Sequence, residues 1–152
     1  MRNPATNKPA KPARAAGIIA AIWVVSFLMG LGIPCFLLAR HAIETDVFSA
    51  AIDEVSGIYA PHVGAILAYY LAARALRRRE TAPPFLAFAL AVIVSVTWNL
   101  IAVGILTRVV TGSAGLEEST KLAGEVSRKL AWVVAPVMGY FFASDVKAAS
   151  RP

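Results

Sequence analysis

The chain has 152 residues, of which 58% are hydrophobic, and its mean hydropathy is +0.65. Charged residues make up only 16% of the chain and fall in blocks, a composition too apolar for a soluble domain of this size. In a soluble protein the formal net charge of +6 would favour a nucleic-acid partner. No soluble domain that could read a groove is predicted here, so we expect no nucleic-acid binding.

Four windows contain no Asp, Glu, Lys or Arg. They cover residues 15–39, 55–73, 81–107 and 130–144. At about 1.5 Å per helical residue, three windows can cross a hydrocarbon core of about 30 Å. The last is shorter, but Arg128 and Lys129 can extend outward and Trp132 can anchor at the interface. The sequence therefore predicts an all-α integral membrane protein with four transmembrane helices. These helices are placed at about 16–39, 56–76, 84–107 and 129–144.

The N-terminal stretch differs from the rest of the chain. It combines prolines and alanines with four cations and cannot build a core. We expect residues 1–15 to be a disordered basic tail and residues 16–152 to be a single four-helix membrane domain. The first apolar window is longer than the core of a cleavable signal, and no small-residue cleavage site follows it. It is therefore expected to remain as a helix.

Lys and Arg are distributed unevenly between the two ends of the predicted helices. The N-terminal tail, residues 74–80 and the C-terminus hold ten of the fifteen, and the two loops on the other side hold five. The positive-inside rule then places both termini in the cytoplasm and the protein in the plasma (inner) membrane. Anionic lipid head groups are the expected partners of the basic edge. This edge consists of Arg74, Arg77, Arg78 and Arg79.

Two segments between the predicted spans have the periodicity of amphipathic helices. Apolar residues recur at helical spacing over about 42–55 and about 116–128, and each segment leads into the next span. We expect amphipathic extensions at the outer membrane interface. A lid over a central cavity is the alternative.

The two halves of the chain resemble each other. The sequence "APHVG" at 60–64 matches "APVMG" at 135–139, and Trp23 and Trp98 hold matching places in the outbound helices. Each half is an out-and-back hairpin of the same orientation, which is a parallel repeat. The sequence therefore predicts two repeated hairpins that form a pseudo-two-fold four-helix bundle.

Prolines and small residues indicate how the predicted spans bend and pack. Pro34, Pro61 and Pro136 each remove a backbone hydrogen bond and are expected to kink their helices. Small residues let neighbouring backbones approach closely. The predicted close-packing positions are Gly64, Ala68, Ala72 and Gly139. Packing within the bundle and packing between protomers explain them equally well.

His62 and Asn99 are the main polar candidates inside the predicted spans. They lie at similar depth on consecutive helices, and the matching places in the other half hold Val137 and Val24. We predict that His62 and Asn99 face each other. The simpler role is one interhelical hydrogen bond that fixes register. The alternative is a polar spot on a water-filled path, where His62 changes charge near neutral pH.

No arrangement suited to catalysis or cofactor binding is recognised. The chain shows no phosphate loop, Ser/His/Asp arrangement or paired carboxylates where chemistry could use them, so we expect no enzymatic activity. His41, the only other histidine, lies in an outer loop, which argues against a haem held by two histidines. Cys35 is the only cysteine, which excludes a cysteine-pair redox centre. We expect neither a cofactor nor a metal.

Two classes of function remain. The first is a self-associating membrane protein that forms an ion or small-solute path or perturbs the bilayer, as a channel-like protein or a membrane effector. The second is a non-catalytic accessory or assembly subunit of a larger membrane complex. A small dimeric transporter is less favoured, because no carboxylate lies within the spans to bind a coupling ion. The expected protein partner is thus a second copy or a larger complex.

Overall fold

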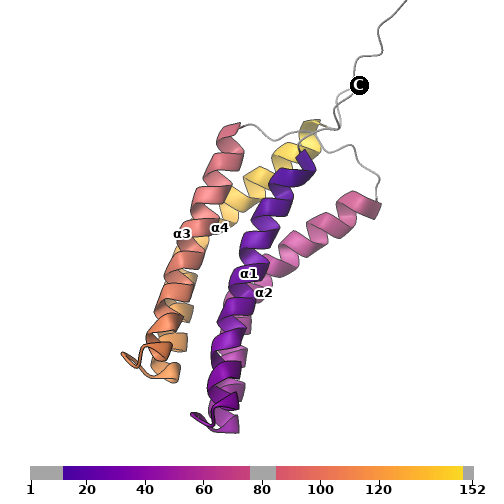
Figure 1. Ribbon diagram of the computed structural model, residues 1–152. Coiled ribbons are helices and arrows are strands. Elements are labelled where there is room, and N and C mark those ends of the chain that lie inside the picture. Colours follow the sequence, from indigo (N-terminus) through magenta and orange to yellow (C-terminus); the bar gives the residue numbers. More distant parts are fainter. Residues whose placement is uncertain (1–11, 76–84, 149–152) are drawn as a thin grey trace, which may run out of the picture.

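The computed structural model describes residues 12–75 and 85–148, and within these ranges the only regular elements are α-helices. They are α1 (Pro12–Ala39), α2 (Thr45–Ala75), α3 (Phe85–Val110) and α4 (Leu116–Ala148). Figure 1 shows them as two antiparallel hairpins, α1 with α2 and α3 with α4. The predicted all-α class with four helices is therefore confirmed for the described part of the chain.

The observed helices extend beyond the predicted spans. The segments 42–55 and 116–128, expected as extensions at the interface, belong almost entirely to the continuous helices α2 and α4. They run alongside α1 and α3 (Figure 1), and Val55 and Ala123 in them are fully buried. The lid interpretation is wrong, because these segments form the walls of the bundle and do not cover its end.

The helix α1 begins at Pro12, about one turn before the predicted start. Proline suits the first turn of a helix, where its missing N–H would have no helical partner. Residues 1–11 of the predicted tail lie outside the described residues, as do Arg77, Arg78 and Arg79 of the predicted basic edge. Arg74 belongs to α2, but its side chain is outside the described part.

Both hairpins turn through the same helix-ending motif. At the end of α1, His41 has φ of 53°, and the Ala42 N–H donates to the Leu37 carbonyl at 2.9 Å. At the end of α3, Gly112 takes the corresponding place with φ of 70°. A left-handed residue just past the last turn lets the next N–H satisfy a free helix carbonyl. These short turns bring α2 back along α1 and α4 back along α3.

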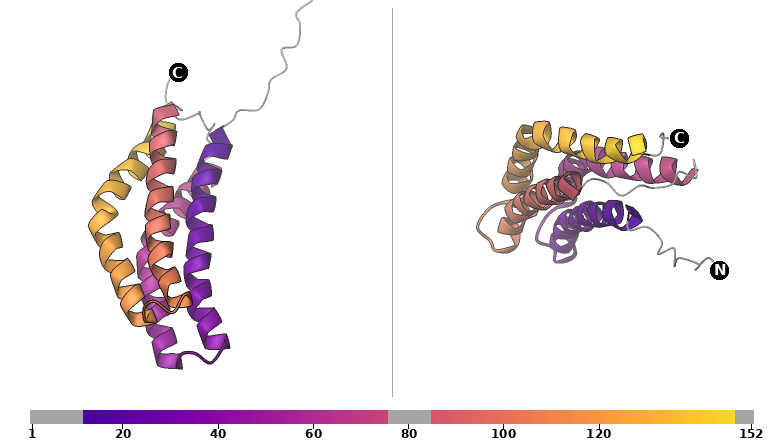
Figure 2. Two further views of the ribbon diagram at one scale, coloured as in Figure 1. Left: turned by 60° about the vertical axis from the view of Figure 1, so that its left-hand side comes forward. Right: turned by 90° about the horizontal axis from the view of Figure 1, so that it is seen from above.

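The two hairpins lie side by side with equivalent helices adjacent. The helix α1 packs on α2 and α3, and α4 packs on the same two helices (Figure 2). The four helices thus form a ring in the order α1, α2, α4, α3. A two-fold axis along the bundle would put α1 and α3 at opposite corners of the ring. The predicted pseudo-two-fold is therefore wrong, because α1 and α3 are neighbours in the ring.

Two pairs of residues at matching places in the two halves are buried in both halves. Trp23 and Trp98 stack on each other with ring centroids 4.7 Å apart, which joins α1 to α3. Ile66 and Phe141, at matching places in α2 and α4, are both buried. The same shift in sequence relates both pairs, as a repeated hairpin requires. The repeat itself stays a prediction.

Two helices bend part-way along their length. Figure 1 shows the second half of α2 turning away from α1, and Figure 2 shows α4 bowed outward. Pro61 and Pro136 lie inside these helices, and an internal proline is the usual cause of a sharp bend. The helix α1 passes through Pro34 with no comparable bend (Figure 1).

Two of the described helices are long and apolar enough to cross a bilayer, at Ala15–Ala39 and Phe85–Val110. Only 33% of each is buried inside the bundle, and their outward surface carries Leu28, Ile93 and Leu100 at 60% exposure or more. In the described residues, α2 and α4 do not meet the same test of length and composition. Length and composition therefore support two membrane-spanning helices, and not the predicted four.

The small residues predicted for close packing do not pack closely within the chain. A Cβ added to Gly64 or Gly139 would meet no atom within 4 Å, and Ala68 is exposed. Ala72 belongs to α2, but its side chain lies outside the described part. Close packing of these positions between protomers stays a prediction.

Close approach inside the chain occurs at Gly30 of α1. A Cβ there would lie 3.1 Å from Val55 Cγ1 and 3.6 Å from Leu106 Cδ1, and both neighbours are fully buried. At Gly32 in the same helix, no atom lies within 4 Å of an added Cβ. These two glycines are a matched pair that differs mainly in packing.

We expect Gly30→Ala to lower the free energy of unfolding by about 1 kcal/mol or more, because overpacking a tight core costs about 1–3 kcal/mol. Gly32→Ala should raise that free energy by about 0.5–1 kcal/mol, the helical preference of alanine over glycine. Unfolding by denaturant in detergent micelles measures both changes. Equal effects of the two substitutions would contradict the close packing at Gly30.

Candidate functional site

Aromatic side chains from three helices meet in the middle of the bundle. His62 of α2 lies over Trp23 with ring centroids 4.5 Å apart and the planes inclined by 34°. Tyr59, almost one turn earlier in α2, meets Trp98 edge-on at 5.3 Å. With the Trp23–Trp98 stack, these four residues form the aromatic cluster. Offset and edge-to-face contacts of this kind stabilise packed rings beyond the area they bury.

Ser95 of α3 connects the aromatic cluster to the fourth helix. Its hydroxyl accepts a hydrogen bond from Trp23 Nε1 at 3.0 Å and donates to Met138 Sδ of α4 at 3.7 Å. Ser95 is fully buried, so no water competes for the indole N–H. One small hydroxyl thus satisfies a buried donor and ties three helices together.

The predicted contact between His62 and Asn99 is not formed. Asn99 Nδ2 donates to the Ser95 carbonyl of its own helix at 2.7 Å, and Asn99 Oδ1 has no partner. His62 lines a cavity between α2 and α4, whereas Asn99 lines a groove between α1 and α3. The two polar candidates therefore belong to opposite sides of the bundle.

Two cavities lie between α2 and α4 and share Glu54 as a lining residue, and together they are called the α2–α4 cleft. The cleft consists of an outer cavity of about 670 Å³ and an inner cavity of about 390 Å³. Glu54 lines both cavities and stands between them, and His62 lines the inner one. Glu54 and His62 are eight positions apart in a continuous helix, so they lie on the same face of α2.

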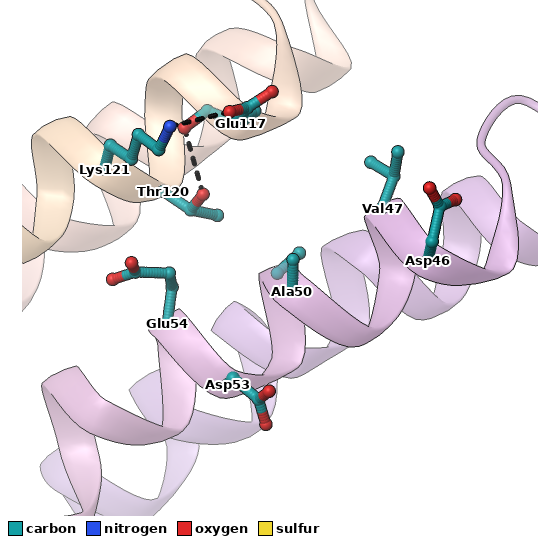
Figure 3. Close-up of a pocket in the computed structure, with 9 residues that line it drawn as sticks. Asp46, Val47, Ala50, Asp53, Glu54, Glu117, Thr120 and Lys121 are labelled. Carbon is teal, nitrogen blue, oxygen red and sulfur yellow. Dashed lines mark hydrogen bonds and ion pairs between the residues drawn. The ribbon is translucent and has the colours of Figure 1, made fainter.

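The outer cavity is acidic. Its charged residues are Asp46, Asp53, Glu54, Glu117 and Lys121. Lys121 Nζ lies 2.6 Å from Glu117 Oε1, and this contact lowers the pKa of Glu117 and raises that of Lys121. Figure 3 shows Glu54 directed toward α4 and Asp53 turned away from it. The excess of carboxylates gives the mouth of the cleft a negative potential that attracts cations.

The inner cavity joins the acidic mouth to the aromatic cluster. Gly124 of α4 lies against Glu54, since a Cβ at Gly124 would be 3.2 Å from Glu54 Oε2. Ser127 and Arg128 of α4 also line this cavity. His62 is half-buried, with one contact surface on the Trp23 ring and another on the cavity. A titratable group therefore stands where the cleft ends.

The cleft offers charge and space, and the described residues do not group as metal ligands. Nowhere in residues 12–75 and 85–148 do three or more His, Cys, Asp or Glu side chains gather in a way that could hold a metal ion. What the arrangement can do chemically is hold water and small ions between two helices and present them to an imidazole.

The sequence analysis did not single out Glu54, Gly124 or Ser95. A signal for Glu54 was present, because Glu54, Ile58 and His62 recur at four-residue spacing. Four-residue spacing places side chains on one face only when they belong to one continuous helix, and the predicted span began after Glu54. Ser95 carried only the signal of a polar residue inside a predicted span, and Gly124 carried none, since the importance of each depends on a neighbour from another helix.

Comparisons with protein-family models, with curated proteins and with solved structures find no match to this chain.

We expect Ser95→Ala to lower the free energy of unfolding by about 1–3 kcal/mol, the cost of leaving the buried Trp23 N–H without an acceptor. In a Trp23→Phe background, which has no such donor, the same substitution should cost much less. Denaturant unfolding of the wild type, the two single variants and the double variant gives the coupling free energy between the two residues. If Ser95→Ala lowered the free energy of unfolding equally in both backgrounds, the Trp23–Ser95 hydrogen bond would contribute nothing to stability.

Proposed function

We propose that the protein is an integral membrane protein whose four helices all cross the bilayer, and that its α2–α4 cleft is a path for ions or small solutes. The apolar outward surfaces of α1 and α3 support the membrane setting. Only a third of the most apolar window in each helix is buried, and large apolar side chains of both helices are exposed, which suits lipid better than water.

The hairpin geometry supports four crossings. Each short turn returns the chain directly along the preceding helix, so α2 and α4 pack against helices that can span a bilayer. Their windows at 55–73 and 130–144 carry no charged residue. The described chain begins and ends at the same end of the bundle, opposite the turns (Figure 1). The excess of Lys and Arg toward that end then favours cytoplasmic termini in the plasma (inner) membrane.

The observation that carries the proposed path is the placement of Glu54 and His62 along one cleft. Ionisable residues at membrane depth are costly and usually line a pathway or cavity. His62 borders the inner cavity, and its imidazole can form a hydrogen bond with water or a solute there. The acidic mouth favours cations over anions.

The positive charge of Arg128 also affects ion flux along the proposed path. Its side chain lines the inner cavity, where a guanidinium repels cations that the acidic mouth attracts. Glu54, which lines both cavities, is the carboxylate able to offset that charge. In a cation path, Glu54 and Arg128 therefore act in opposite directions on the flux.

We expect the purified protein to conduct ions in liposomes, and His62→Val to reduce that flux or abolish its dependence on pH between about pH 5 and about pH 8. Valine is the residue at the matching place in the other half, at Val137. Flux through wild type and variant is recorded with an ion-sensitive dye inside the vesicles. Thermal unfolding of both proteins separates a blocked path from a misfolded chain.

Two results would contradict the path. If the wild type conducts nothing, the accessory-subunit function becomes the better one, and the protein should then co-purify with a larger complex. If the wild type conducts and His62→Val changes neither the flux nor its pH dependence, His62 is a packing residue of the aromatic cluster.

We expect Glu54→Gln to lower cation flux by roughly threefold to tenfold at low salt and Arg128→Gln to raise it, because local potential sets ion concentration in a cleft. Glu125→Gln is the matched control: it makes the same change at an exposed position of α4 that lines neither cavity. Vesicle flux at low and high salt measures all three. The reverse signs for Glu54→Gln and Arg128→Gln would indicate an anion path.

A further inference from the structure

The inner cavity of the α2–α4 cleft has two opposite charges in its lining. Glu54 of α2 and Arg128 of α4 both line it, and its volume is about 390 Å³. Within the described part of the chain neither side chain forms an ion pair, and Lys121 pairs with Glu117 instead. An anion and a cation thus border one cavity without direct contact, and both charges are available to a solute.

The packing of α2 on α4 sets the spacing of these two charges. Figure 3 shows Glu54 directed toward α4, and Gly124 lies opposite it, because a Cβ at Gly124 would be 3.2 Å from Glu54 Oε2. Arg128 follows Gly124 by four residues in a continuous helix, which is about one turn or about 6 Å along α4. Arg128 is therefore attached about one turn farther from the hairpin turns than the level of Glu54.

A buried hydroxyl without a partner lies next to Arg128. Ser127 lines the same cavity and is only 8% exposed. Its Oγ makes no hydrogen bond within the described residues and, unlike Ser119 Oγ, is not closed off from its surroundings. Buried hydroxyls normally have a hydrogen-bond partner. An accessible one without a partner therefore indicates a molecule in the cavity.

The remaining lining of the inner cavity is mostly apolar. It includes Ile58 and Pro61 of α2 and Ala131 and Ala135 of α4. Hydrocarbon fits against such residues, because its burial there leaves no polar group unsatisfied. His62 adds an imidazole that can donate or accept a hydrogen bond. A fitting solute combines an apolar body with one positive and one negative group.

We propose that the inner cavity binds a small zwitterion, namely an α-amino acid with an aliphatic side chain. Glu54 binds its ammonium group, and Arg128 and Ser127 bind its carboxylate. A guanidinium presents paired N–H donors that suit a carboxylate, and a carboxylate side chain accepts the hydrogen bonds of an ammonium. An α-amino acid carries both charged groups on one carbon, so they reach partners about one helical turn apart.

A zwitterion suits this cavity better than an ion of either sign. A simple cation that binds Glu54 is repelled by Arg128, and a simple anion that binds Arg128 is repelled by Glu54. A molecule with both charges places each next to its opposite. Its aliphatic side chain then lies against the apolar part of the lining.

This binding site rests on the proposed function, because it names the small solute of the α2–α4 path. Binding is measured without reference to flux, so the two proposals fail separately. A protein that binds the amino acid and conducts nothing would refute the path and leave the site standing. A protein that conducts ions and binds no amino acid would refute the site and leave the path standing.

The test is equilibrium dialysis of radiolabelled L-leucine against the full-length protein in detergent micelles. Two competing analogues each lack one charged group: 3-methylbutylamine has no carboxylate, and 4-methylpentanoate has no ammonium. We expect L-leucine to bind about tenfold more tightly than either analogue or better, since charge-assisted hydrogen bonds are the strong ones. No binding of L-leucine, or binding of either analogue as tight as that of L-leucine, would overturn the proposal.

Substitutions then assign the two charges. Glu54→Gln should abolish the preference for L-leucine over 4-methylpentanoate and keep the preference over 3-methylbutylamine, and Arg128→Gln should do the opposite. Ser127→Ala should weaken L-leucine binding by roughly threefold to tenfold, the contribution of one hydrogen bond. It should leave thermal unfolding unchanged, because Ser127 makes no bond within the described residues. Glu125→Gln, at an exposed position outside both cavities, is the matched control.

The pattern across the variants decides the assignment. Thermal unfolding of each variant identifies any chain that does not fold, and Ser127→Ala together with the two analogues then still tests the site. Equal losses of L-leucine binding in Glu54→Gln and Glu125→Gln would overturn the proposal. So would a loss of the same preference in both Glu54→Gln and Arg128→Gln.

Discussion

The stack of Trp23 on Trp98 is the contact on which the rest of the arrangement depends. The stack joins the two hairpins through α1 and α3, which are their first helices. The other two helices, α2 and α4, are each linked to this stack. Tyr59 and His62 bring α2 onto the two indoles, and Ser95 passes a hydrogen bond from Trp23 on to Met138 of α4. Because His62 packs on this stack, the imidazole is held at the inner end of the α2–α4 cleft.

The rough architecture could be predicted from the sequence because it depends on local properties. Charge-free windows and helical periodicity located the four helices. The predicted contact between His62 and Asn99 was wrong, because similar depth on two helices does not determine how each helix is rotated about its own axis. In the structure these residues point to opposite sides of the bundle.

The features that the sequence did not predict depend on where each helix begins and on which helices are neighbours. The sequence analysis separated 42–55 from the following span, so the common face of Glu54 and His62 was not recognised. The pseudo-two-fold was the simplest arrangement of two like hairpins, and a sequence contains no direct record of which helices are neighbours. Equivalent helices lie side by side here, which is what separates an α2–α4 side with polar groups from an α1–α3 side that is almost wholly apolar.

The indole pair has an optical consequence. Two indoles with centroids 4.7 Å apart and planes inclined by 37° couple their electronic excitations, and because the rings are not parallel the pair should give a circular-dichroism couplet that a single tryptophan lacks. The third tryptophan, Trp132, is 76% exposed and should emit separately according to the polarity of its surroundings. The circular-dichroism signal of this tryptophan pair therefore reports on the spacing between the two hairpins, and no added label is needed to measure it.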